Sequence, residues 1–138
     1  MSHSGNKARC MALAAAALFS ARPSPALADV YVIINSTLTV AADDIKLIYT
    51  GDKELVGATK IKPLDNHAAA SEFLSKVLQL NAGRYKSLWT MKSYRDGLTP
   101  PAVKATDDEV IAYVQSTPGA IGYVMSAPPA GVVVLKKF

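Results

Sequence analysis

Cysteine and histidine are nearly absent from this 138-residue sequence. It contains one cysteine, Cys10, and two histidines, His3 and His67. A single cysteine cannot form an intramolecular disulfide, and a zinc site needs three or four protein ligands. We therefore expect no disulfide, no metal site and no cofactor.

The sequence also lacks an apolar run long enough for a membrane-spanning helix. The apolar segment CMALAAAALFSA, residues 10–21, is far shorter than the ~20 residues that such a helix needs. It follows the basic residues Lys7 and Arg9 and precedes Ala26-Leu27-Ala28, an A-x-A cleavage site. We predict that residues 1–28 are a cleaved signal peptide, that the mature protein is periplasmic, and that it is not inserted in the membrane.

The predicted mature chain, residues 29–138, has almost no excess of one sign of charge over the other. Cleavage would remove three of the 15 basic residues, which leaves 12 against 11 acidic ones and a net charge of +1. No basic patch interleaved with aromatic residues remains, so we expect no nucleic-acid partner. The remaining 110 residues suffice for one hydrophobic core, and we predict a single domain.

The mature sequence alternates between strand-like and helix-like patterns. Val30 to Ile34 is a continuous apolar run, typical of a strand covered on both faces. A second strand is expected to end near Pro63, and later strands are expected at 120–124 and 132–135.

Helix-like patterns separate these strands. Thr106 to Glu109 is a capping box and Asn81 a predicted N-cap, whereas Lys92 to Lys104 reads as a long loop. The alternation predicts a single α/β lobe of three layers, with a largely parallel or mixed sheet flanked by helices.

Two polar loops follow predicted strands and are the candidate binding residues. Asn35, Ser36 and Thr37 follow the first strand, and Asn66, His67, Ala68 and Ala69 lead from the second strand into a helix. A helix N-terminus presents unpaired N–H groups and a partial positive charge. Because ligands gather at the carboxyl ends of strands in α/β sheets, we predict that both loops lie at one sheet edge and bind a small anion such as phosphate.

Catalysis has weaker support. Asp65, His67 and Ser71 lie close together in sequence, but a triad needs a base within hydrogen-bond reach of a nucleophile, and no nucleophile elbow surrounds Ser71. We expect no catalytic residue and no enzyme activity.

The order of these segments resembles a known family. DDIKLIYTGD at 43–52, the strand leading into a helix with Phe73, Trp89, and STPGAIGYV at 116–124 are together similar to the phosphate-binding-protein-like family. Its members are type II periplasmic solute-binding proteins of phosphate ABC transporters. The resemblance implies one lobe of such a protein, a small anion such as phosphate as ligand, and a transporter permease as partner.

The sequence departs from the family at the predicted turn, and this supports an alternative. Full-length phosphate binders have Ser-Gly-Thr where this chain has His67-Ala68-Ala69, and the resemblance covers only one of two lobes. The alternative is an envelope protein that keeps the lobe fold and binds another protein. The apolar strand Val132 to Leu135 is a candidate edge strand that could pair with a strand of that partner.

Overall fold

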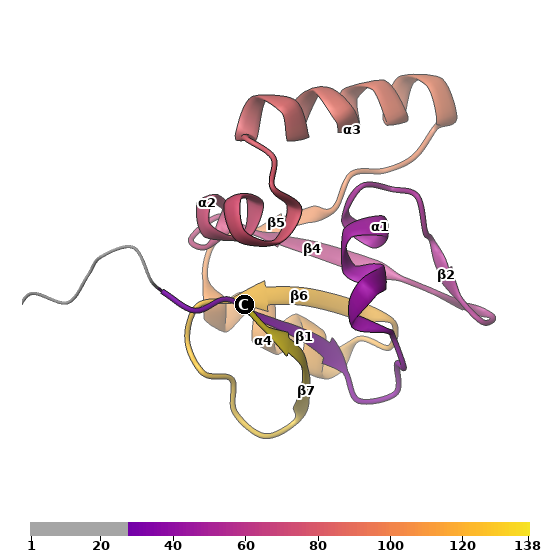
Figure 1. Ribbon diagram of the computed structural model, residues 1–138. Helices are drawn as coiled ribbons and strands as arrows, with labels where there is room; N and C mark the ends of the chain where they lie inside the picture. Colours follow the sequence, from indigo (N-terminus) through magenta and orange to yellow (C-terminus); the bar gives the residue numbers. More distant parts are fainter. Residues whose placement is uncertain (1–27) are drawn as a thin grey trace, which may run out of the picture.

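The computed structural model describes residues 28–138, which form a five-stranded sheet with helices on both faces and a separate two-stranded sheet (Figure 1). The predicted signal peptide falls almost entirely on residues 1–27, outside the described residues. The strands are β1 (Tyr31–Asn35), β2 (Leu55–Val56), β3 (Thr59–Lys60), β4 (Lys62–Asn66), β5 (Ala102–Lys104), β6 (Ala120–Val124) and β7 (Val132–Lys137). The helices are the 3-10 turn η1 (Ala42–Asp44), α1 (Ile45–Tyr49), α2 (Ala70–Phe73), the π-helical turn η2 (Leu74–Leu78), α3 (Ala82–Asp96) and α4 (Asp107–Ser116).

The sheet is mixed, with strand order β5-β4-β6-β1-β7. β4 is parallel to both β5 and β6, whereas β1 is antiparallel to both β6 and β7. The α/β class and the mixed form of the sheet are thereby confirmed. β1 is buried on both faces, with Val32 and Ile34 in the core on one side of the sheet and Ile33 in the core on the other, which explains why its sequence is a continuous apolar run.

Helices cover the two faces unequally. α1, α2 and η2 pack on one face around Ile45, Phe73 and Leu78, and α4 packs on the other face through Val110 and Val114. α3 lies beyond α1 and α2 and stands away from the sheet (Figure 1). Its only buried side chain is Trp89, whose indole N–H donates to the Tyr49 carbonyl at 3.0 Å. None of the helices within residues 28–138 combines the length and the apolar character needed to cross a membrane.

Both predicted helix starts are confirmed by their capping bonds. The Asn81 side chain accepts the Arg84 N–H at 2.8 Å, and the Thr106 hydroxyl accepts the Glu109 N–H at 3.3 Å. Each side-chain oxygen satisfies a donor that the first helical turn leaves unpaired.

Two expected boundaries were wrong. β4 does not end near Pro63: Pro63 is its second residue, and pairing with β5 begins only at Leu64, so the missing proline N–H costs no bond on that side. The expected loop from Lys92 to Lys104 is also much shorter, because α3 continues to Asp96 and β5 begins at Ala102. α3 ends where Gly97 adopts φ +69°, a left-handed conformation that glycine adopts without steric cost.

Candidate functional site

The first predicted binding loop is joined to α4 by hydrogen bonds of Asn35. Asn35 is buried, and its amide donates to the Val114 carbonyl at 2.8 Å and the Gln115 carbonyl at 3.3 Å. Its side-chain oxygen accepts the Thr37 N–H at 3.0 Å and the Thr37 hydroxyl at 2.6 Å. Asn35 therefore ties the end of β1 to the last turn of α4, while Ser36 and Thr37 lie exposed beside it.

The second predicted loop has its N–H groups already occupied. His67 N–H donates to the Lys104 carbonyl at 2.8 Å, Ala68 N–H to the Asn66 side-chain oxygen at 3.0 Å, and Ala69 N–H to the Asn66 carbonyl at 3.0 Å. Asn66 is fully buried, and its amide also donates to Asp107 at 2.7 Å and to the Tyr123 carbonyl at 2.9 Å. An anion could use these three N–H groups only by displacing bonds that shape the turn.

The two loops do not meet, so the expectation of one shared sheet edge was wrong. β1 runs antiparallel to β6, and β6 runs parallel to β4. The carboxyl end of β1, with Asn35 to Thr37, therefore lies at the opposite end of the sheet from Asn66 to Ala69. The rule about carboxyl ends applies to parallel strands, and the sequence alone did not show that β1 is reversed.

The structure assembles a different cluster beside the second loop, centred on Asp65. One carboxylate oxygen accepts the Tyr123 hydroxyl at 2.8 Å, and the other accepts the Tyr85 hydroxyl at 2.9 Å. Burial raises the pKa of Asp65, and the two tyrosine hydrogen bonds lower it in part. Burial, followed by the nearby Asp65 charge, raises the pKa of both tyrosines, so both hydroxyls remain protonated donors.

Buried aromatic rings in the core hold the Asp65 cluster in place. The rings of Phe73 and Tyr123 stack at a centroid distance of 3.8 Å, and Tyr49 meets both edge-on. The Tyr49 hydroxyl donates to the Leu64 carbonyl at 2.8 Å, which anchors it to the backbone just before Asp65. The Tyr123 hydroxyl is thus held by a packed core, and its bond to Asp65 is pre-organised.

A cavity of about 460 Å³ opens beside Asp65 at the carboxyl end of β4. Asp65, Tyr85 and Tyr123 contribute its hydroxyls and carboxylate, and Lys86 and His67 contribute nitrogen-bearing side chains. Its remaining lining is mostly apolar, including Ala70, Leu74, Ala82 and Val103. The cavity can hold a small molecule that has both polar and apolar parts.

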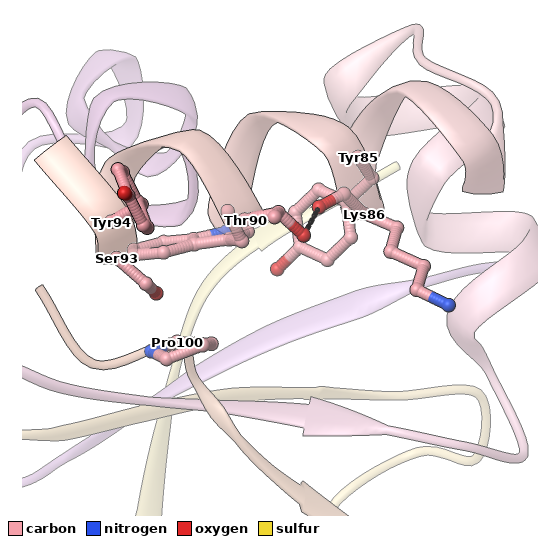
Figure 2. A pocket seen from close by; sticks show the side chains of 7 residues that line it. Tyr85, Lys86, Thr90, Ser93, Tyr94 and Pro100 are labelled. Carbon is pink, nitrogen blue, oxygen red and sulfur yellow. Dashed lines mark hydrogen bonds between the residues drawn. The ribbon is translucent and has the colours of Figure 1, made fainter.

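A shallow groove adjoins this cavity along α3. It has a volume of about 670 Å³, and Tyr85, Lys86, Trp89, Thr90, Ser93, Tyr94 and Pro100 line it. Figure 2 shows α3 above Pro100, with Tyr94 and Lys86 at opposite ends of the groove. Tyr85 and Lys86 therefore border both hollows, and a ligand in the cavity can extend toward the groove.

The described residues offer neither a metal cluster nor a linked triad. Across 28–138 no three histidine, cysteine or carboxylate side chains are grouped to hold a metal ion. Both Asp65 oxygens accept tyrosine hydroxyls, and within these residues no hydrogen bond joins Asp65, His67 and Ser71.

Sequence reasoning missed the Asp65 cluster because its members come from three separate segments. Asp65 lies in β4, Tyr85 lies in α3 and Tyr123 lies in β6, and no spacing in the sequence connects the three. The one available signal was the Asp65 carboxylate directly after the apolar Leu64, because a carboxylate that becomes buried needs hydrogen-bond partners.

Comparisons with known proteins support the fold. No family model and no curated protein sequence matches the chain. An ABC-type phosphate transport receptor from Vibrio cholerae matches 79% of this chain and 46% of its own, with a TM-score of 0.50 and 14% identity. A substrate-binding protein assigned to a phosphate ABC transporter of Clostridium perfringens, solved with bound phosphate, matches 79% and 45%, with a TM-score of 0.56 and 17% identity.

These matches confirm the expected resemblance at the level of fold. The chain has the fold of one lobe of a phosphate-binding protein, and it spans less than half the length of the two receptors.

Proposed function

We propose that this chain is an exported, periplasmic solute-binding protein of the phosphate ABC-transporter type, reduced to one lobe. The observation that carries this proposal is the cavity at the carboxyl end of β4, where ligands gather in α/β folds. One structural neighbour is named as a phosphate transport receptor and the other as a phosphate ABC transporter substrate-binding protein, so a small anion such as phosphate is the first ligand to test. Export through the predicted signal peptide belongs to the same proposal.

In this proposal an anionic group binds at the rim of the cavity. The N–H groups of His67, Ala68 and Ala69 already donate to acceptors within the chain and are not free to bind an anion. Positively charged side chains must therefore bind it instead. Lys86 is exposed at the rim and forms no ion pair within residues 28–138, and the exposed His67 side chain lines the same cavity. A lysine binds an anion as a point charge, without the geometric selection of an arginine fork.

Calorimetric titration with phosphate, sulfate and acetate tests the proposal directly. We expect binding that Lys86→Met weakens at least tenfold, because this change removes the rim charge but keeps the aliphatic stem. Lys46→Met, at an exposed position on α1 outside the cavity lining, is the matched control and should bind like the unaltered protein. If no solute produces heat or an NMR amide shift at millimolar concentration, the proposal fails.

A second candidate function, binding of another envelope protein, is favoured by β7. This strand lies at one edge of the sheet, and Val133 and Val134 are each 44% exposed on it. An edge strand can pair with an extended segment of another chain. The partner would be a transporter permease or another envelope protein. Crosslinking from a photoreactive residue at position 134 in intact cells tests this, and a crosslinked partner lost in Val133→Lys would support it.

A further inference from the structure

Resting on the proposed function, we propose that the cavity binds a zwitterionic solute of the amino-acid type, with its ammonium group on Asp65. Two features carry this inference: a carboxylate at the cavity wall with unused acceptor capacity, and a lysine at the rim that forms no ion pair within residues 28–138. Apolar side chains line much of the space between them.

Asp65 can accept more hydrogen bonds than the protein supplies. An ionised carboxylate has about four lone-pair positions. The Tyr123 and Tyr85 hydroxyls use one position on each oxygen, at 2.8 and 2.9 Å. An ammonium group carries three donors and a positive charge, so it fits the free positions and offsets the desolvation of the carboxylate.

The same carboxylate disfavours a simple anion. A negative group entering the cavity meets Asp65 in a partly desolvated setting, where like charges repel more strongly than in water. Among residues 28–138, the hydroxyls that line the cavity are those of Tyr85 and Tyr123, and both already donate to Asp65. A negative group is therefore placed best at the rim, near Lys86 and His67, with the positive group inward.

The apolar lining adds room for an aliphatic side chain. Leu74, Ala70 and Val103 line the cavity, and Val103 is 65% exposed. Covering these side chains with a hydrocarbon group removes apolar surface from water. A branched amino acid such as leucine combines all three features: ammonium, carboxylate and aliphatic side chain.

Three probes with nearly the same carbon skeleton separate these contributions. L-leucine carries both charges, 4-methylpentanoate lacks the ammonium, and 3-methylbutylamine lacks the carboxylate. By calorimetry at pH 7 we expect leucine to bind most tightly, the amine at least tenfold more weakly, and 4-methylpentanoate at least 100-fold more weakly. Asp65→Asn should abolish leucine binding, and Lys86→Met should weaken leucine but leave the amine unchanged.

The control is Asp108→Asn, which removes an exposed carboxylate on α4, across the sheet from the cavity. It should bind leucine like the unaltered protein, and an NMR spectrum of each variant shows whether it is folded. If phosphate or 4-methylpentanoate binds as tightly as leucine, the zwitterion inference is overturned while the proposed function stands. If the amine binds as tightly as leucine, the role of Lys86 is overturned. If the three probes produce no heat and no amide shifts but phosphate, sulfate or acetate does, the zwitterion inference alone fails; if none of these solutes binds, both proposals fail.

Discussion

At the scale of single residues, the hydroxyl of Tyr123 is one of the two that hold the Asp65 carboxylate. This hydroxyl donates to the carboxylate at 2.8 Å, and its ring is fixed by stacking on Phe73. The Tyr123→Phe change keeps the stacking and removes only the donor. We expect it to lower the free energy of unfolding by about 1–3 kcal/mol, measured by urea denaturation, because a partly buried carboxylate loses a charge-assisted bond.

Tyr94→Phe is the matched control for that change. Tyr94 is 95% exposed, so losing its hydroxyl should leave the unfolding midpoint unchanged. An equal loss of stability in the two variants would show that the bond from Tyr123 to Asp65 contributes nothing.

The burial of Asp65 also predicts how stability depends on pH. Its pKa in the folded state is raised above the ordinary value of 3.8, so the folded chain binds a proton more readily than the unfolded chain. The favourable contribution of protonated Asp65 is complete below the unfolded pKa and is lost as pH rises through the folded pKa. Above pH 3.8, the unaltered protein should therefore gain stability on acidification relative to Asp65→Asn.

Urea denaturation of both proteins between pH 4 and pH 7 measures this difference. Asp52→Asn provides the contrast, because the hydrogen bond from Lys92 lowers the pKa of Asp52, so its contribution to stability is nearly complete across this range and is lost only as pH falls below 3.8. A difference between the unaltered protein and Asp65→Asn that does not vary with pH would contradict the assigned burial of this carboxylate.

At the scale of elements, the contact between α4 and β6 depends on the absence of a side chain at Gly122. A Cβ placed there would lie 2.5 Å from a methyl carbon of Val110 and 3.4 Å from one of Val114. We expect Gly122→Ala to lower the free energy of unfolding by about 1–3 kcal/mol, the usual cost of overpacking a core. Thermal denaturation followed by circular dichroism measures the change.

Two variants test whether the cause is steric. Adding Val110→Ala to Gly122→Ala makes room for the new methyl group, so the double variant should lose less than the sum of the two single changes. Gly83→Ala, in the first turn of α3 with only the Asn81 side chain nearby at 3.4 Å, should be neutral or stabilising by up to about 1 kcal/mol. Additive losses in the double variant would exclude the clash as the cause.

At the scale of the whole molecule, the first described residues are joined to the last. Val30 and Phe138 exchange backbone hydrogen bonds at 3.1 and 2.8 Å, and Asp29 pairs with Lys137 at 3.3 Å. If the signal peptide is cleaved after Ala28, the mature chain begins where these contacts begin. Intact-mass spectrometry of the periplasmic fraction should give a chain starting at Asp29, whereas the mass of the 138-residue chain would contradict cleavage.

The sequence by itself determined most of the local structure. The start of α3 at Asn81, the start of α4 at Thr106 and the apolar run of β1 depend on neighbouring residues, and all three were predicted correctly. The α/β class followed from the alternation of such segments, because each pattern buries its apolar face against its neighbours.

Only the tertiary structure decided the direction of β1 and the composition of the candidate site. A strand buried on both faces has the same apolar pattern whether its neighbours are parallel or antiparallel, so the sequence could not show that Asn35 and Asn66 lie at opposite ends of the sheet. Asp65, Tyr85 and Tyr123 are likewise far apart along the chain, and no local spacing connects them. Their hydrogen bonds exist because packing brings β4, α3 and β6 together, and that packing is a property of the whole fold.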